Sequence, residues 1–176
     1  MHMKYFLLEQ DTKCLEVPQL VNWSRKVETK NLVPERYAYI PKVTVLFCKF
    51  ASNSAGKELI VKPWLLLPEE AADLLSQFEP YMKYKDMPLV DQSKEKMEKY
   101  MFPLLKKYDC LSKKTKMNQD KSMIIEGVLD GDKIPDQVLF ILDGPSSTNI
   151  VVRQDYVECL LKRYIFGFRL RELEVE

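Results

Sequence analysis

The sequence lacks most of the residues and motifs on which common catalytic sites depend. Only one of its 176 residues is a histidine, His2, so a Ser–His or Cys–His nucleophile pair would have to form at the chain terminus. No GxGxxG, GxxxxGKS, GxxxxGKT, HExxH or GxSxG motif is present. These absences predict that the protein is not an enzyme and that it takes no cofactor.

Zinc and calcium signatures are missing as well. A structural zinc site needs clustered thiolates or imidazoles, whereas the cysteines are scattered, with no CxxC pair and no histidine nearby: Cys14, Cys48, Cys110 and Cys159. The acidic loop DGDKIPD at 130–136 lacks the glutamate and the spacing of an EF-hand. We therefore expect reduced thiols and no metal site. A small enzyme that uses carboxylates or a metal is the less favoured alternative.

The chain has no excess of either charge and no long apolar run. Lys and Arg number 27 against 26 Asp and Glu, so the bulk attraction that non-specific nucleic-acid binding needs is missing. No apolar run reaches the ~18 residues that span a bilayer, and the opening MHMKYFLLEQ does not resemble a signal peptide. We expect a cytoplasmic protein that binds neither nucleic acid nor membrane.

Charge is nevertheless uneven along the chain. Residues 91–121 hold nine Lys and five acids, a local +4, and residues 122–149 hold one Lys and five acids, a local −4. The two stretches either neutralise one another in space or form two faces that meet a polar partner.

Hydrophobic residues make up 46% of the sequence, enough to bury a core, and their pattern predicts an α+β fold. We expect a single domain, 1–176, with a mixed or mainly antiparallel sheet and two main helices, Pro68–Phe78 and Arg153–Tyr164.

β-Branched and aromatic runs bounded by turn residues predict strands at Tyr5–Leu8, Val43–Phe50, Leu59–Val61 with Trp64–Leu67, Met123–Leu129, Val138–Leu142 and Ile150–Val152. Met123–Leu129 and Val138–Leu142 are expected to be neighbours, and Asp143–Asn149 to be a loop. Residues 97–105 fit either a helix or an edge strand, and Pro103 favours the strand.

A strand–helix–strand pattern occurs twice, at an offset of 86 residues. Four apolar positions of the first predicted helix fall on four of the second at the spacing of one helix face: Ala71, Leu74, Leu75 and Phe78 on Val157, Leu160, Leu161 and Tyr164. Met82 and Tyr84 likewise fall on Phe168 and Leu170, each pair alternating with cations as a strand does. The repeat indicates two related ligand sites, a packing unit that is duplicated or recurrent, or a coincidence of two amphipathic helices.

These periods predict which side chains form the core, since one face of each helix and alternate residues of each strand are expected to point inward. The predicted core residues are Val45, Phe47, Leu66, Leu74, Leu75, Phe78, Ile124, Val128, Leu139, Ile141, Val151, Leu160, Leu161, Phe168 and Leu170.

Aromatic and arginine residues gather near the N-terminus. They are Trp23, Arg25, Arg36, Tyr37 and Tyr39, in the segments PQLVNWSRK and PERYAYIPK. This mixture is typical of the centre of a protein–protein interface, because both residue types bury a large area at modest entropic cost. We predict that these five residues bind a protein partner. For Trp23 the alternative is that it anchors the N-terminal loop to the core.

The run IPDQVLFILDG, followed by NIVVRQDYVECLLKRYIFGFRLRELE, resembles the end of a bacterial immunity-protein family, the eleventh of the polymorphic-toxin immunity families. The matching pieces are a strand at 134–142, a strand at 150–152, a helix at 153–164 and a closing strand at 167–173. The segments MKYFLLEQ and PQLVNW are also similar to the openings of members, whereas Arg153 stands where the family usually has a serine.

The resemblance implies a cytoplasmic protein that binds and neutralises a cognate toxin and carries no catalytic residues. A regulatory or interaction module without a toxin is the alternative.

Overall fold

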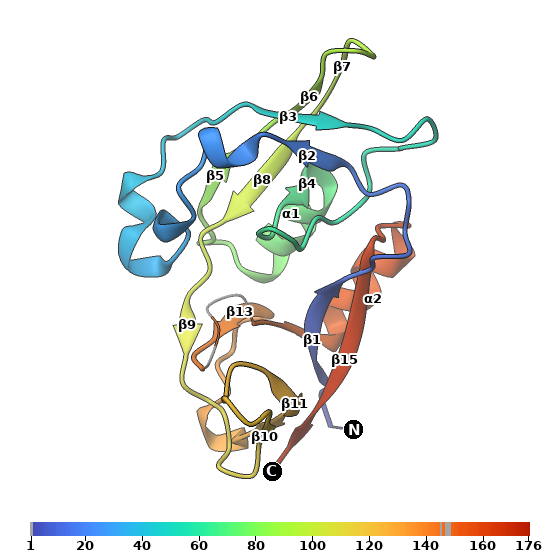
Figure 1. Ribbon diagram of the computed structural model, residues 1–176. Helices are drawn as coiled ribbons and strands as arrows, with labels where there is room; N and C mark the ends of the chain where they lie inside the picture. Colours follow the sequence, from blue (N-terminus) through green and yellow to red (C-terminus); the bar gives the residue numbers. More distant parts are fainter. Residues whose placement is uncertain (1, 145, 147–148) are drawn as a thin grey trace.

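The computed structural model describes residues 2–144, 146 and 149–176, and its architecture is α+β (Figure 1). The helices are α1, Glu69–Phe78, and α2, Gln154–Lys162. Pro68 and Arg153, expected inside the helices, instead occupy the positions immediately before them. The α+β prediction is confirmed, but the strands of the described part form four separate sheets rather than one.

The largest sheet has six strands and joins the two ends of the chain. Its order is β12 (Val128–Leu129), β15 (Phe168–Val175), β1 (Tyr5–Gln10), β14 (Ile150–Arg153), β13 (Leu139–Leu142) and β9 (Lys107–Tyr108). β1 lies between β14 and β15 and is antiparallel to both. The strands predicted near Tyr5, Val138 and Ile150 are thereby confirmed.

The predicted strand Met123–Leu129 is two short strands in the structure, and neither of them pairs with β13. Gly127 divides it into β11, Ile124–Glu126, and β12, and β12 pairs with β15 at the side of the sheet opposite β13. A Cβ atom on Gly127 would lie 2.3 Å from Leu173 Cδ2, so a larger residue at this position would force the Leu173 side chain to shift. The expectation that β12 and β13 are neighbours is therefore wrong.

Two smaller sheets form the upper part of the molecule in Figure 1. One has the order β2 (Gln19–Val21), β3 (Leu46–Lys49), β6 (Leu89–Asp91), β7 (Lys96–Glu98), and the other the order β4 (Leu67–Pro68), β8 (Tyr100–Pro103), β5 (Tyr84–Asp86). Strand structure within 97–105 is confirmed. β8 is central rather than an edge strand, and it accommodates Pro103 as its last residue.

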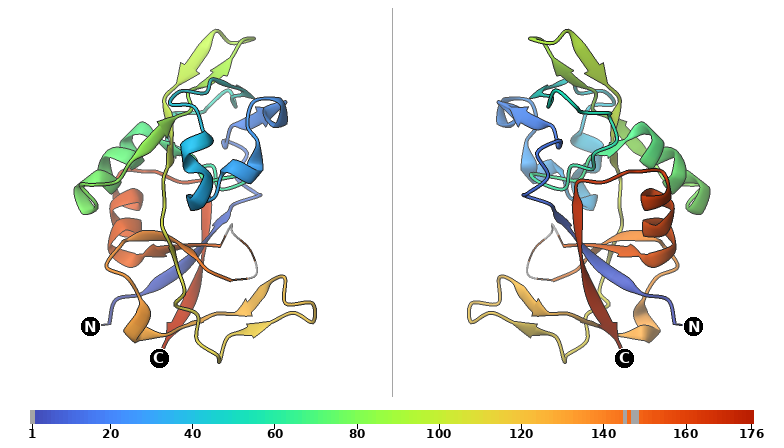
Figure 2. Two further views of the ribbon diagram at one scale, coloured as in Figure 1. Left: turned by 90° about the vertical axis from the view of Figure 1, so that its left-hand side faces the viewer. Right: turned by 90° about the vertical axis from the view of Figure 1, so that its right-hand side faces the viewer.

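The remaining elements are short. β10, Lys116–Met117, and β11 form a hairpin that projects away from the body of the molecule (Figure 2). The 3-10 helices are η1 (Trp23–Arg25), η2 (Thr29–Asn31), η3 (Pro34–Tyr39) and η4 (Gly131–Lys133). Leu59–Val61 and Trp64–Leu67 form no long strand, because the chain reverses around Pro63 so that Ile60 pairs with Leu66. In the predicted loop 143–149, residues 145, 147 and 148 lie outside the described residues, and the others are in neither helix nor strand.

The predicted strand–helix–strand recurrence is confirmed, and its two copies share a topology. β4–α1–β5 and β14–α2–β15 each enclose a third strand that is antiparallel to both of its neighbours, β8 in the first copy and β1 in the second. The two helices contact one another across the main hydrophobic cluster, where Tyr156 donates a hydrogen bond to the Ala71 carbonyl at 2.8 Å. The small side chains of Ala71 and Ala72 leave room for this approach.

The two helices do not bury equivalent faces. Leu75 is fully buried in α1, but its counterpart Leu161 is 55% exposed. α2 buries Tyr156, Val157 and Leu160 instead, and Tyr156 fills the space between the helices. Leu161 lies about 140° around the helix from Tyr156 and so faces away from α1. The prediction that Leu161 belongs to the core is wrong.

β3 shows a similar error of phase. The strand is shorter than Val43–Phe50, and it turns Leu46, Cys48 and Phe50 inward, whereas Val45 is exposed and Phe47 is half-buried. Apolar residues occupy both faces of this segment, so its alternation does not determine which face is buried. The other predicted core residues are buried or packed against a core cluster: Leu66, Leu74, Leu75, Phe78, Ile124, Val128, Leu139, Ile141, Val151, Leu160, Phe168 and Leu170.

The paired leucines provide a direct test of the helix faces. Leu75→Asp should abolish the cooperative unfolding transition, because a buried, unpaired carboxylate costs several kcal/mol, comparable with the stability of a whole domain. Leu161→Asp should lower the free energy of unfolding by less than about 1 kcal/mol, since its side chain stays in water. Urea titration followed by circular dichroism measures both. An equal loss in the two variants would contradict the assignment of the α2 face.

Candidate functional site

The five residues predicted to bind a partner lie on two 3-10 helices near the N-terminus, Trp23 and Arg25 on η1 and Arg36, Tyr37 and Tyr39 on η3. They do not form one uniform contact surface. Two of them point into the protein and hold the helices in place, and three are available to a partner.

Trp23 and Tyr37 are anchors. The Trp23 ring meets the buried Trp64 ring edge-on, with centroids 5.3 Å apart. Tyr37 donates a hydrogen bond to the Leu105 carbonyl at 2.9 Å, and its ring packs edge-on against Phe102 at 5.6 Å. Burial raises the pKa of Tyr37 well above its usual value, so the hydroxyl stays protonated and keeps this hydrogen bond. The alternative interpretation of Trp23, as an anchor of the N-terminal loop, fits this geometry.

Arg36, Tyr39 and Arg25 are the accessible members. The Arg36 guanidinium stacks 4.6 Å from the centre of the Tyr39 ring, and Arg36 Nε donates to Asn31 Oδ1 at 2.9 Å. Tyr39 is 66% exposed, and Arg25 is also exposed. The stack and the bond to Asn31 fix the orientation of both side chains while leaving the tyrosine face in water.

The structure adds two residues that sequence analysis assigned to other roles. Val43 and Val45 follow Tyr39 on the same segment and are exposed, forming an apolar strip that leads towards β3. We call the set Arg25, Arg36, Tyr39, Val43 and Val45 the N-terminal face. Residues 22–47, which contain it, hold five cations and two acids, a local charge of +3.

An ion pair joins the two oppositely charged stretches: Lys116, from the basic stretch, lies 2.6 Å from Glu126 of the acidic stretch. Within the acidic stretch, Lys133 pairs with Asp130 at 3.2 Å. Lys114 pairs with Glu176. These contacts involve two of the nine lysines of the basic stretch, Lys114 and Lys116.

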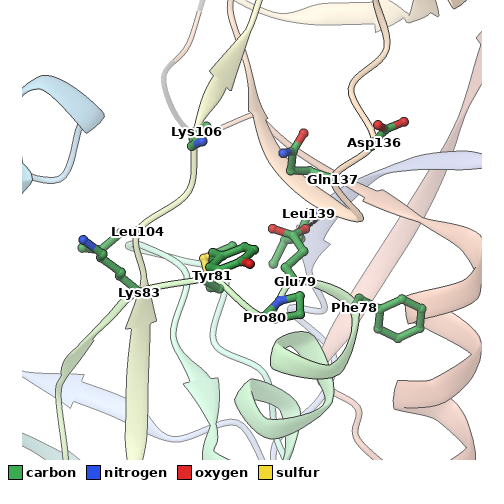
Figure 3. Close-up of a pocket in the computed structure, with 11 residues that line it drawn as sticks. Phe78, Glu79, Pro80, Tyr81, Lys83, Leu104, Lys106, Asp136, Gln137 and Leu139 are labelled. Atoms are coloured by element: carbon green, nitrogen blue, oxygen red, sulfur yellow. Dashed lines mark hydrogen bonds between the residues drawn. The ribbon is translucent and has the colours of Figure 1, made fainter.

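A cleft of about 580 Å³, lined by both apolar and charged residues, lies between the end of α1, the segment joining β8 to β9 and the loop before β13 (Figure 3). Figure 3 shows Lys83 and Lys106 on one side of the cleft and Asp136 on the other. Its charges are mixed, and the described residues that line it include no histidine or cysteine. The charged groups that the cleft offers are therefore carboxylates and amines.

Glu79 is the one carboxylate of this cleft with a defined structural role. It follows α1 directly, and its Oε1 accepts hydrogen bonds from the backbone N–H groups of Val138 at 2.8 Å and Leu139 at 3.3 Å. Burial raises the pKa of Glu79, and the two backbone hydrogen bonds oppose that rise only in part. Its contacts make Glu79 a link between α1 and the start of β13.

Neither metal nor membrane chemistry gains support from the described residues. They contain no group of three or more His, Cys, Asp or Glu side chains that could hold a metal ion. Within the same residues no helix is long and apolar enough to cross a membrane. The four cysteines are unpaired, and burial raises the pKa of Cys110 to about 11, so this thiol stays protonated.

Comparison with known proteins finds no family model that matches the chain and no curated protein similar to it. The resemblance to the immunity family accordingly rests on the sequence motifs alone, and the functional argument rests on the geometry.

Glu79 generates a prediction about stability. Glu79→Ala should lower the free energy of unfolding by about 1–3 kcal/mol, because it leaves two backbone N–H groups without their acceptor. Glu79→Gln keeps an acceptor oxygen and should cost much less. Urea titration of both variants separates loss of the hydrogen bonds from loss of the charge, and equal costs would contradict the linking role of Glu79.

The raised pKa of Glu79 also predicts a pH dependence. Because the folded pKa is raised, its stabilising contribution is present below the unfolded value of about 4.3 and is lost as the pH rises through the folded value. Glu79→Gln should therefore gain stability relative to the wild type as the pH rises from about 4.3 through the folded pKa of Glu79. A stability advantage of Glu79→Gln over the wild type that became smaller as the pH rises would contradict this prediction.

Proposed function

We propose that the protein is a non-catalytic binding protein that acts by forming a stoichiometric complex with a protein partner through the N-terminal face. The observation that carries the proposal is the Arg36–Tyr39 stack, in which Tyr39 is 66% exposed, followed along the chain by the exposed Val43 and Val45. Tyrosine and arginine are among the residues that most often dominate binding energy in protein interfaces.

The packing beneath the N-terminal face favours tight binding of a partner. η1, η2 and η3 carry no side-chain cap hydrogen bonds, so contacts made by Trp23 and Tyr37 hold the first and last of them against the core. A surface that is already ordered loses less conformational entropy when a partner binds. The anchors therefore contribute to binding indirectly, by preorganising the residues that touch the partner.

The charge of the face indicates the chemistry of the partner. The local charge of +3 over residues 22–47 favours a partner with an acidic contact surface. Such complementarity raises the association rate, and added salt screens it.

The family resemblance suggests that this partner is a toxin. Its motifs, at 134–142 and 150–173, lie in β13, β14, α2 and β15, which form much of the six-stranded sheet and its helix. In this proposal the sheet is the shared scaffold, and the N-terminal face supplies recognition of the cognate toxin. Immunity through sequestration requires no catalytic group on the binding protein.

The test is co-purification with the toxin-like protein encoded beside this chain, followed by calorimetric titration. Tyr39→Ala and Arg36→Ala should each raise Kd about thirtyfold, the effect of losing about 2 kcal/mol at a dominant contact, and they should leave stability nearly unchanged. Tyr81→Ala is the matched control, since Tyr81 is 95% exposed and lies outside the face. Wild-type affinity in both face variants would remove this surface from the proposal.

Trp23→Ala has a different expected outcome. Because Trp23 packs on Trp64, its truncation should lower the free energy of unfolding by about 3 kcal/mol. Any loss of affinity should then accompany a lower melting temperature. If no protein encoded nearby binds the wild-type chain, the immunity proposal itself fails.

A further inference from the structure

A second cavity lies against η2 and η3 and is lined by none of the residues of the N-terminal face. It measures about 370 Å³, and its walls come from four separate parts of the chain: η2 and η3, the turn around Pro63, the end of β8 and the six-stranded sheet. Its aromatic lining consists of Tyr37, Trp64 and Phe102. This volume is within the range of small-molecule sites, and apolar walls are typical of them.

The lining is mostly apolar, and its charged group lies at the outer edge of the cavity. Among the described residues that line the cavity, Lys30 is the only charged one, and it is exposed at the outer edge with Thr29. Lys30 forms an ion pair with Glu28 at 3.1 Å, in which both side chains are more than 60% exposed. Such an exposed pair is weak and can yield to a competing anion.

One residue of the lining carries an unpaired donor. Trp64 is only 5% exposed, and its indole Nε1 has no hydrogen-bond partner among the described residues. Buried donors are nearly always paired in protein cores. A tryptophan that lines the cavity therefore departs from ordinary core packing.

We propose that this cavity binds a small amphipathic carboxylate, with its hydrocarbon part against the aromatic walls and its carboxylate at Lys30. The cavity has room for about twelve non-hydrogen atoms, each taken as the size of a water molecule. A ligand of this size is a medium-chain aliphatic acid or an arylalkanoic acid. A longer chain would extend into solvent, and a cation would find no countercharge in the lining.

The experiment uses decanoate as the probe and decanol as its uncharged counterpart, with the full chain and the fluorescence of Trp23 and Trp64 as the readout. Decanoate should bind saturably, one molecule per chain, with a Kd below about 1 mM. Lys30→Gln should raise the decanoate Kd about fivefold and leave the decanol Kd unchanged. Lys30 is exposed, so this variant should fold normally.

Two further variants decide where the probe binds. Val33→Trp places a large side chain in the lining and should abolish saturable binding of both probes. Leu161→Ser removes an exposed apolar side chain elsewhere and should change neither Kd, which controls for detergent-like adsorption. Non-saturable binding, or binding that Val33→Trp and Lys30→Gln leave unchanged, would overturn the proposal.

A different result would reassign the cavity. If decanoate does not bind and Val33→Trp instead weakens the complex with the protein partner, the cavity receives a side chain of that partner, and the carboxylate proposal is wrong. Tyr39→Ala should affect only the partner titration, so failure of the proposed function and failure of this inference remain distinguishable.

Discussion

The pairing of β1 with β14 and β15 is the constraint on which the rest of the structure depends. The first strand of the chain lies between two of its last strands, with the register Leu8 opposite both Ile150 and Leu170. No β-hairpin can supply this arrangement, so the large sheet closes only when residues about 150 positions apart meet. Once formed, the sheet is buried on both faces: Leu8, Ile141 and Val152 pack into the helix-covered cluster, and Leu7, Phe140 and Val151 into the opposite one.

Burial on both faces also explains what the sequence could and could not predict. Continuous apolar runs such as VLFIL and IVV mark strands covered on both sides, and they were placed correctly. Apolar residues on both faces of a segment, in contrast, hide the phase of a strand: Val45, just before β3, and Leu46, its first residue, are both suitable for a core, and only the neighbouring β2 and β6 determine which one turns inward. Leu161 was misassigned for a related reason, since the position of Tyr156 against α1 sets the rotation of α2.

The residue composition indicated which segments carry the candidate site, but not which of their residues are anchors and which are contacts. Aromatic and arginine residues singled out the segments of the proposed site, yet the same residue type has two structural roles there: Tyr37 bonds to the Leu105 carbonyl, whereas Tyr39 stacks beneath Arg36 in solvent. Leu105, which accepts the hydrogen bond from Tyr37, is distant in the sequence, and the spacing of Arg36 and Tyr39 follows no strong pattern. The apolar cavity left no local signal at all, because its lining is gathered from residues 29–37, 61–65, 102–105, 141 and 150.

Tyr37 connects the two proposed sites physically. It belongs to η3, which carries Arg36 and Tyr39 on its outer side, and its ring forms part of the cavity wall on the inner side. An uncapped 3-10 helix has little stability of its own, so the order of the outer face depends on the packing beneath it. A ligand that fills the cavity adds contacts to that packing and lowers the entropy that η3 still has to lose when a partner binds. Because binding free energies are reciprocal, a partner that orders η3 would strengthen ligand binding by the same factor.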